Sequence, residues 1–454
     1  MNDLTKGKIG TTLLKFAVPF ILASFLQALY GAADLFMVGR FSSSSDVAAV
    51  AIGSQLMQTI TGIILGIATG GTVLIGHHIG KKDQVGVARS IGALAMLFVA
   101  IGIPLTLGMG ILTNSAVAWM KTPIDAVQAA QHYVFVCAMG IPFIIGYNVM
   151  SAIFRGLGDS KSPFYFVLVA CITNIVVDFI LVGSFDMGAY GAALATILAQ
   201  GISFILAILY SIHKKSIPHF EKKYFKLAKE PIQFIFKVGM PLALQDGLVN
   251  ISFLIITAII NTMGLVASAS LGVVEKIIVF AMLPPAAFGS AISAMSAQNI
   301  GAGLPHRAIK ILRYGILYSL VFGITATTYC QIYPQTLTAL FTSDPEVVKV
   351  AASYLMSFSI DCIMVSFVFC MNGYFSGSGQ SLFSLIHSLI ATFGVRIPLT
   401  YVFSRIENVS IYTLGLAAPA ASLVSIVICM GYFYCLRKKG LLGKDKVSEI
   451  EYAS

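Results

Sequence analysis

Five acidic residues lie inside long apolar stretches of the sequence, where a charged side chain is costly. A charge at the centre of a bilayer costs at least about 2.5–3.5 kcal/mol, so an acid at that depth marks a functional site or a compensating partner. A carboxylate in such a place can bind a proton or a hard cation such as Na⁺, because either one restores neutrality. The five acids are Asp34, Asp178, Asp246, Glu275 and Asp361.

Two of these acids belong to a polar set in the first half of the chain, which consists of Asp34, Asn174, Asp178 and Thr196. Asn174 and Asp178 are four residues apart and therefore share one helix face. A helical rise of about 1.5 Å per residue places all four at depths of about 17 to 27 Å from the inner side of a core about 30 Å thick. We therefore expect an oxygen-rich site for H⁺ or Na⁺ in the outer half of the membrane. The alternative is a polar network that only joins helices.

The three acids of the second half leave two interpretations open. They can attract a cationic substrate into a cavity, or they can be paired locally, for example with Arg396. Methionine side chains can line an adaptable pocket or simply pack. The residues predicted to line a substrate cavity are Gln27, Tyr30, Asp246, Glu275, Asp361 and Met282.

Pro19 lies in the same apolar segment as Asp34. A proline inside a helix removes one backbone hydrogen bond, here the one to the carbonyl of Lys15, so the helix is expected to kink there. We hypothesise that this helix bends when Asp34 is protonated.

The composition indicates which elements must position these residues. Charged residues make up 11% of the 454 residues, against about 25% in typical soluble domains, and the apolar set makes up 57%. Such a chain cannot cover a large water-facing surface with charge, so soluble enzymes, disordered scaffolds and secreted disulfide modules are excluded. The seven cysteines lie inside apolar segments without a CxxC pair, which is typical of buried thiols.

Twelve apolar segments are long enough to cross a bilayer as helices, since a span needs about 20 mainly apolar residues. The predicted fold is an all-α integral membrane protein. The predicted spans are residues 14–38, 47–79, 87–112, 126–154, 163–184, 189–212, 232–262, 266–300, 308–333, 347–377, 383–404 and 411–436.

The basic residues predict the orientation of these spans. With the N-terminus inside, the cytoplasmic segments carry 23 of the 29 lysines and arginines, and the outer segments carry four. Only Lys276 and Arg396 lie well inside a span, because every other lysine or arginine within the predicted ranges lies within about five residues of a span end and is counted with the adjoining segment. This bias follows the positive-inside rule, so both termini are predicted to be cytoplasmic. The net charge of +10 therefore describes topology and does not indicate a nucleic-acid partner.

The two halves of the chain repeat at an offset of 221 to 222 residues. "KFAVP" at Lys15–Pro19 pairs with "KVGMP" at Lys237–Pro241, and "FRGLG" at Phe154–Gly158 pairs with "FSGSG" at Phe375–Gly379. Six spans per half give both halves the same orientation, which predicts two six-helix lobes related by a parallel pseudo-twofold axis, with a cavity between them. The predicted regions are an N-terminal lobe at 1–212, a basic cytoplasmic linker at 213–231, a C-terminal lobe at 232–436 and a cytoplasmic tail at 437–454.

The repeat also serves as an internal control for the polar set. At this offset Asp34 corresponds to Ile255 or Ile256, and Thr196 corresponds to Ala417 or Ala418. Asn174 corresponds to Val395 or Arg396, and Asp178 to Leu399 or Thr400. Because the second half lacks the set, the sequence favours a specialised coupling site in the first half.

Four motifs carry a resemblance to a known family, and they lie at Tyr30–Phe41, Phe154–Pro163, Asn174–Val182 and Gln298–Gly303. By these motifs the chain resembles the multidrug and toxin extrusion (MATE) family over essentially its full length, and it looks closest to the DNA-damage-inducible F branch. The resemblance implies that Asp34, Asn174, Asp178 and Thr196 match the family's first-lobe cation site and that Pro19 matches its kinked proline. Another branch uses a pair of acids in the second lobe, and Asp246 and Asp361 are shifted from the places expected for that pair.

The resemblance implies a secondary-active antiporter of the inner or plasma membrane that exports organic cations or amphipathic molecules in exchange for H⁺ or Na⁺ by alternating access. No GxxxxGK[ST] run is present, so ATP is not expected to drive the transport. We also expect no other cofactor, and a monomer that is not an enzyme. One alternative is a lipid-linked saccharide flippase of the same architecture, which would need a basic cavity. Another is a membrane receptor or enzyme, which would need a ligand domain or a nucleophile–base pair.

Overall fold

The computed structural model describes residues 3–214, 222–407 and 409–439. These residues form helices and no strand. Twelve helices among them are long and apolar enough to cross a membrane, and they coincide with the twelve predicted segments. The prediction of an all-α, multi-pass membrane protein is therefore confirmed. Part of the predicted linker (215–221) and most of the predicted tail (440–454) lie outside the described residues.

The chain divides into two compact units. Unit 1 contains residues Val18–Ala243 and is built from the helices of the first half of the chain. Its elements are α1 (Ile9–Phe41, from Val18 onward), α2 (Ser44–Lys81), α3 (Gln84–Trp119), η1 (Ile124–Ala126), α4 (Val127–Gly156), α5 (Lys161–Asp178), η2 (Phe179–Ser184), α6 (Gly188–His213), η3 (Lys222–Tyr224) and the first part of α7 (Lys229–Asn261).

Among the described residues, unit 2 contains Leu4–Ala17 and the chain from Leu244 to Lys439. Its elements are the first part of α1, the rest of α7, α8 (Leu265–Gly301), α9 (Pro305–Ile332), α10 (Pro334–Thr338), α11 (Pro345–Gly377), α12 (Ser381–Ala391), η4 (Thr392–Arg396), α13 (Ile397–Ser404), α14 (Ile411–Gly415) and α15 (Ala417–Lys438).

The two units differ from lobes that simply follow chain order, because α1 and α7 each contribute to both units. The change of unit falls between Ala17 and Val18 in α1 and between Ala243 and Leu244 in α7. Each boundary lies within three residues of a proline, Pro19 in α1 and Pro241 in α7.

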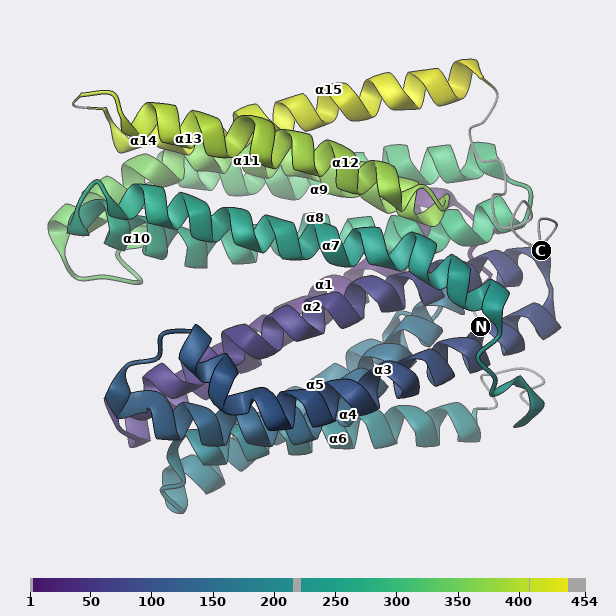
Figure 1. Cartoon of the computed structure of the whole chain (residues 1–454). Helices are drawn as coiled ribbons and strands as arrows, with labels where there is room; N and C mark the ends of the chain where they lie inside the picture. The colour runs from purple at the N-terminus through teal and green to yellow at the C-terminus, as the bar shows by residue number, and fades with distance from the viewer. Residues whose placement is uncertain (1–2, 215–221, 408, 440–454) are drawn as a thin grey trace. The chain divides into compact units, whose positions relative to one another are not determined.

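The fourth span of each half is the central helix of its unit. In unit 1, α4 runs alongside α3 and α6 (Figure 1) and packs against α2, α3 and α6. Among the twelve candidate spans, its span has the largest buried share. In unit 2, α11 packs against α8, α9, α14 and α15. Without a hydrophobic driving force in lipid, such packing depends on small residues that let backbones approach. A Cβ atom on Gly373 of α11 would lie 2.2 Å from the backbone oxygen of Gly289 on α8, so glycine permits this contact.

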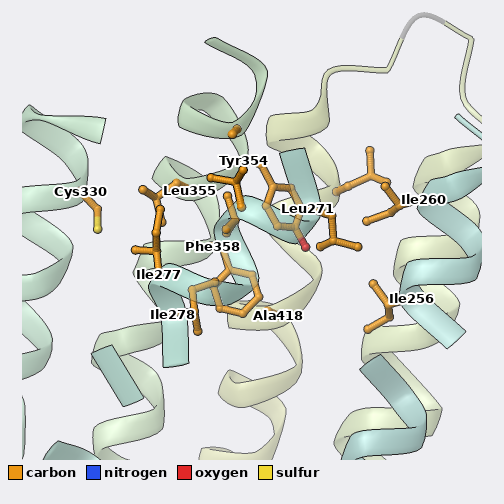
Figure 2. Close-up of a cluster of buried hydrophobic side chains, with 14 of the residues drawn as sticks. Ile256, Ile260, Leu271, Ile277, Ile278, Cys330, Tyr354, Leu355, Phe358 and Ala418 are labelled. Carbon is orange, nitrogen blue, oxygen red and sulfur yellow. The ribbon is translucent and has the colours of Figure 1, made fainter. Parts of the chain in front are cut away.

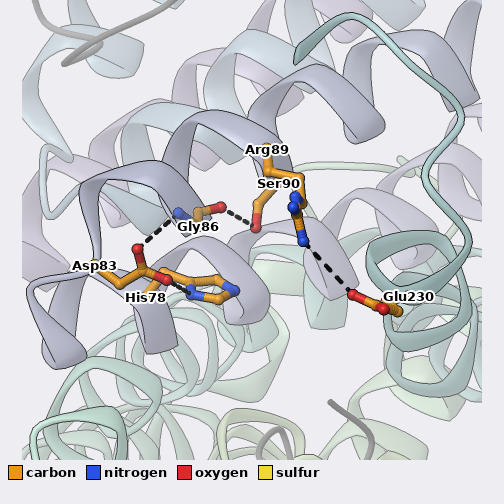
Figure 3. A network of polar contacts seen from close by, with 6 residues as sticks. All are labelled: His78, Asp83, Gly86, Arg89, Ser90 and Glu230. Carbon is orange, nitrogen blue, oxygen red and sulfur yellow. Dashed lines mark hydrogen bonds and ion pairs between the residues drawn. The ribbon is translucent and has the colours of Figure 1, made fainter. Parts of the chain in front are cut away.

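Polar side chains cap the starts of α2 and α3. Ser43 caps α2 and forms a capping box with Asp46, and the Asp83 carboxylate caps α3 by accepting from the backbone N–H of Gly86 at 2.9 Å. The same Asp83 carboxylate lies 3.0 Å from His78 Nδ1 on α2 (Figure 3). The α2–α3 turn is therefore held by one carboxylate with two partners.

The starts of α1 and α7 are attached to their units by different contacts. In unit 1, Arg89 on α3 forms an ion pair with Glu230 at the start of α7, with 3.6 Å between nitrogen and oxygen (Figure 3). In unit 2, Nη2 of Arg307 on α9 donates to the carbonyls of Lys6 and Gly7, each at 2.8 Å. One start is held by an exposed charge pair and the other by hydrogen bonds to its backbone.

Candidate functional site

Three helices of unit 1 each present two polar side chains that are four residues apart. This spacing places both members of a pair on one helix face. The pairs are Tyr30 and Asp34 on α1, Asn174 and Asp178 on α5, and Thr196 and Gln200 on α6.

The four residues predicted as a set lie together in the structure. The Thr196 hydroxyl donates to Asp34 Oδ2 at 3.1 Å. The side chains of Asp178 and Asn174 lie next to the Asp34 carboxyl without a further hydrogen bond among the described residues. One turn away on the same helices, Gln200 Nε2 donates to the Tyr30 hydroxyl at 3.2 Å. Helices α1, α5 and α6 thus converge on one polar cluster, which we call the unit 1 cluster (Asp34, Asn174, Asp178 and Thr196).

The unit 1 cluster is deeply buried and poorly supplied with hydrogen-bond donors. Asp34 is 4% exposed, Asn174 1% and Asp178 0%. Within the described part of the chain, Asp34 Oδ1, both Asp178 carboxylate oxygens and the Asn174 amide atoms have no hydrogen-bond partner. An unpaired buried carboxylate is costly unless a proton or a cation neutralises it. Carboxylate, amide and hydroxyl oxygens are also the ligands that hard cations prefer, so the residues present fit Na⁺ as well as H⁺.

A local change of helix geometry lies beside the cluster. Helix α5 ends at Asp178 and continues as the π-helical segment η2. Single π-helical turns inside longer helices occur frequently at functional sites, because the wider turn redirects the side chains that follow. The sequence pattern did not predict this segment, since its apolar composition suits α and π geometry equally.

Two neighbours of the cluster were not predicted from sequence. Gln200 could have been found, because it follows Thr196 by four residues on a spanning helix. Tyr133 lies close enough to Asp34 to interact with it electrostatically and pairs with the Ser54 hydroxyl at 2.9 Å. Tyrosine is common in buried helices, so spacing alone gave no signal for Tyr133.

The remaining cavity candidates lie in different surroundings. In unit 1, Gln27 is exposed and Tyr30 is half-buried beside Gln200. In unit 2, Asp246 is exposed on α7, while Met282 is half-buried and packs against an apolar cluster. Figure 2 shows most of this cluster, whose buried side chains come from α7, α8, α9, α11, α14 and α15. A role for any of them in substrate binding stays a prediction.

Two further acids of unit 2 share one environment. Glu275 on α8 and Asp361 on α11 both interact electrostatically with Arg396 at the end of η4. Among the described residues, neither acid forms an ion pair with it within 4.0 Å. The local pairing with Arg396 considered from sequence is therefore not seen as a direct ion pair among the described residues, and it stays a prediction.

Pro19 lies inside α1, which is one continuous helix from Ile9 to Phe41. The proline therefore sits on the element that carries Tyr30 and Asp34. Bending of α1 with the protonation of Asp34 stays a hypothesis.

Together, twelve spanning helices and a buried oxygen-rich cluster define a polytopic membrane protein with a candidate site for a monovalent cation. The sequence profile of the MatE family matches the chain twice, over residues 19–180 and 241–402. The chain therefore belongs to the MatE family. The two matches differ by 222 residues at both ends, which confirms the internal repeat.

Individual proteins similar to this chain cover nearly all of it. It is 26% identical over 442 residues to the probable multidrug resistance protein YoeA of Bacillus subtilis (strain 168), covering 96% of each. It is 29% identical over 404 residues to the probable multidrug resistance protein YpnP of the same organism, covering 88% of this chain and 90% of that protein. The solved outward-facing conformation of a multidrug resistance MATE family transporter of the MOP superfamily matches with a TM-score of 0.89. That match covers 99% and 98% of the two chains at 19% identity, which shows a shared fold.

Proposed function

We propose that this protein is a secondary-active multidrug efflux antiporter, which exports small organic cations or amphipathic molecules in exchange for H⁺ or Na⁺. One observation carries the proposal. Two carboxylates, both at most 4% exposed, lie together in a spanning region with three of their four oxygens unpaired among the described residues. A buried pair of this kind favours the uptake of a proton or cation. The multidrug resistance names of the relatives support the substrate class.

In this proposal the unit 1 cluster is the coupling site. Asp34 and Asp178 supply negative charge, and Asn174 and Thr196 supply neutral oxygens or a hydroxyl donor. Binding of the coupling ion neutralises the cluster. Release of the ion restores a negative charge, which is unfavourable in the apolar surroundings. The two states therefore differ in energy and can favour different conformations, as alternating access requires.

We further propose the orientation of the chain in the membrane and the branch of the family to which it belongs. The positive-inside bias of 23 to four supports cytoplasmic termini in the inner or plasma membrane. The presence of the unit 1 cluster supports the assignment of the chain to the DNA-damage-inducible F branch. A flippase would need basic cavity residues, and Arg396, one of two in-span bases, is attracted to two acids instead.

The experiment uses purified protein in proteoliposomes that are loaded with ethidium, a fluorescent organic cation. Efflux is followed while a pH gradient and a Na⁺ gradient are imposed separately, with the membrane potential clamped by K⁺ and valinomycin. The clamp matters because about 100 mV supplies about 2.3 kcal/mol per charge, comparable to more than one pH unit. We expect one of the two gradients to accelerate efflux in the wild type.

The coupling assignment is tested by Asp34→Asn, which should lose the response to the gradient. The matched control is Asp125→Asn, which changes an exposed acid near the start of α4 and should behave like the wild type. If Asp34→Asn responded to the gradient at the wild-type rate, the unit 1 cluster would not be the coupling site.

A further inference from the structure

Unit 2 contains a second buried group of acids, formed by Glu275 on α8 and Asp361 on α11. Asp361 is 5% exposed, and its Oδ1 has no hydrogen-bond partner among the described residues. Glu275 is half-buried, and its Oε1 accepts from the Thr257 hydroxyl at 3.5 Å. As in the unit 1 cluster, two negative charges in a spanning region cost free energy unless they are neutralised.

Arg396 brings a positive charge to these acids. Its guanidinium carbon lies 4.3 Å from the centre of the Phe253 ring and 5.7 Å from that of Phe358, so it is held by cation–π contacts. Phe358 is three residues before Asp361 on α11, a spacing that shares one helix face. Phe253 is four residues before Thr257 on α7, and the Thr257 hydroxyl donates to Glu275. The two aromatic contacts therefore place the guanidinium on the helix faces that hold the acids, within electrostatic reach of both. Phe358 belongs to the apolar cluster of Figure 2, so the acids and the arginine lie in a medium that screens charge poorly. We call Glu275, Asp361 and Arg396 the unit 2 cluster.

The internal repeat relates Arg396 to the unit 1 cluster. At the offset of 222 residues, Arg396 takes the position of Asn174. At the same offset Ile256 takes the position of Asp34, and continuing it pairs Ala418 with Thr196. Both replacements are buried members of the apolar cluster (Figure 2). The unit 1 cluster therefore has two acids and no base, whereas the unit 2 cluster has two acids and one base at an equivalent position.

We propose that Arg396 is a built-in counter-cation, which takes the place of a mobile coupling ion and keeps the unit 2 acids from binding one. The arginine thereby limits the protein to a single exchangeable cation site and sets its ion stoichiometry. This inference rests on the proposed function, because it takes the unit 1 cluster to be the site of the mobile ion.

The direct test measures the binding of ²²Na⁺ to purified protein at pH 8.5, where protons compete little. All variants carry Asp34→Asn and Asp178→Asn, so that binding at the unit 1 cluster is absent and the two proposals fail independently. We expect no bound Na⁺ in this background and about one Na⁺ per chain after Arg396→Asn is added. Further addition of Asp361→Asn should remove that ion again.

Two control substitutions locate the effect. Arg396→Lys keeps the charge and should bind no Na⁺, and Lys276→Gln removes an exposed base next to Glu275 and should also bind none. A folded Arg396→Asn variant that binds no Na⁺ would overturn the proposal. So would binding that survives Asp361→Asn and Glu275→Gln together.

Thermal unfolding provides a second readout that does not need the single variant to fold. Removing one member of a buried charge group leaves the others unbalanced, so Arg396→Asn should lower the unfolding midpoint by about 5 °C or more. Adding Asp361→Asn should restore at least half of the loss, or restore folding if the single variant does not fold. An equal or larger loss in the double variant would contradict the proposal.

Discussion

The two units come from one duplicated sequence and share one arrangement of helices. At two equivalent interior positions, however, unit 1 has polar residues and unit 2 has apolar ones. The positions occupied by Asp34 and Thr196 in unit 1 are Ile256 and Ala418 in unit 2, where they pack in an apolar cluster. Each unit is nevertheless organised around the fourth span of its half. The fold therefore does not require the acids, and their presence in unit 1 is best explained by function, since function is carried by sites placed on a common fold.

The largest expected effect comes from forcing the unit 1 residue into unit 2. Ile256→Asp should lower the free energy of unfolding by about 3 kcal/mol or more, because it buries an unpaired carboxylate among apolar side chains. Thermal unfolding in detergent measures the change. The control Ile256→Val should cost only about 1 kcal/mol. Equal stability of the two variants would show that unit 2 tolerates an acid there.

Neutralising a buried acid of unit 1 should affect function and stability in opposite directions. Asp178→Asn removes a buried carboxylate that has no hydrogen-bond partner in the described part of the chain, so the unfolding midpoint should stay the same or rise. Gradient-driven ethidium efflux should fall about 100-fold, equivalent to about 2.7 kcal/mol of lost coupling. The matched control is Asp186→Asn, an exposed residue that follows η2. A destabilised variant with normal efflux would instead indicate a polar network that only joins helices.

A smaller effect is expected from the hydroxyl that contacts Asp34. Thr196→Val removes the 3.1 Å hydrogen bond, and hydrogen bonds to charged groups are worth about 1.5–3 kcal/mol. We expect the apparent affinity for the coupling ion to weaken about 10-fold, as measured by the dependence of efflux on the concentration of that ion. Thr196→Ser should retain the wild-type affinity. If Val and Ser behaved alike, the hydroxyl would not take part in ion binding.

The smallest effect concerns the two helix starts. Arg307→Ala should cost about 1 kcal/mol, because it leaves two backbone carbonyls of the α1 start without their donor. Arg89→Ala should cost less than about 0.5 kcal/mol, because the side chains of Arg89 and Glu230 are 55% and 43% exposed. Thermal unfolding at low and high salt compares them. Only the Arg89 effect should vanish at high salt, and a larger loss for Arg89→Ala would reverse this ranking.

Much of the fold could be predicted from the sequence. Each span needs a long apolar run, and hydropathy records such runs directly, so all twelve were found. The division of α1 and α7 between units was not predicted. Hydropathy reports that a segment is buried in lipid or protein, but it does not report which neighbours it packs against. Pro19 and Pro241 lie near the two unit boundaries, but a proline in the sequence does not show that its helix passes from one unit to the other.

The site was predictable where residue spacing and charge coincide. The pair Asn174 and Asp178 stood out, because charge is rare in spans and four residues make one helical face. The role of Arg396 was harder to see, because its partners come from other helices and its aromatic contacts are visible only in three dimensions.

We propose that unit 1 binds the coupling ion and that unit 2 does not. The most direct measurement compares Asp34→Asn with Asp361→Asn, one buried acid from each unit, in the same gradient-driven ethidium efflux assay. We predict that Asp34→Asn loses the response to the gradient and that Asp361→Asn keeps it. A normal response in Asp34→Asn together with a lost response in Asp361→Asn would contradict the account.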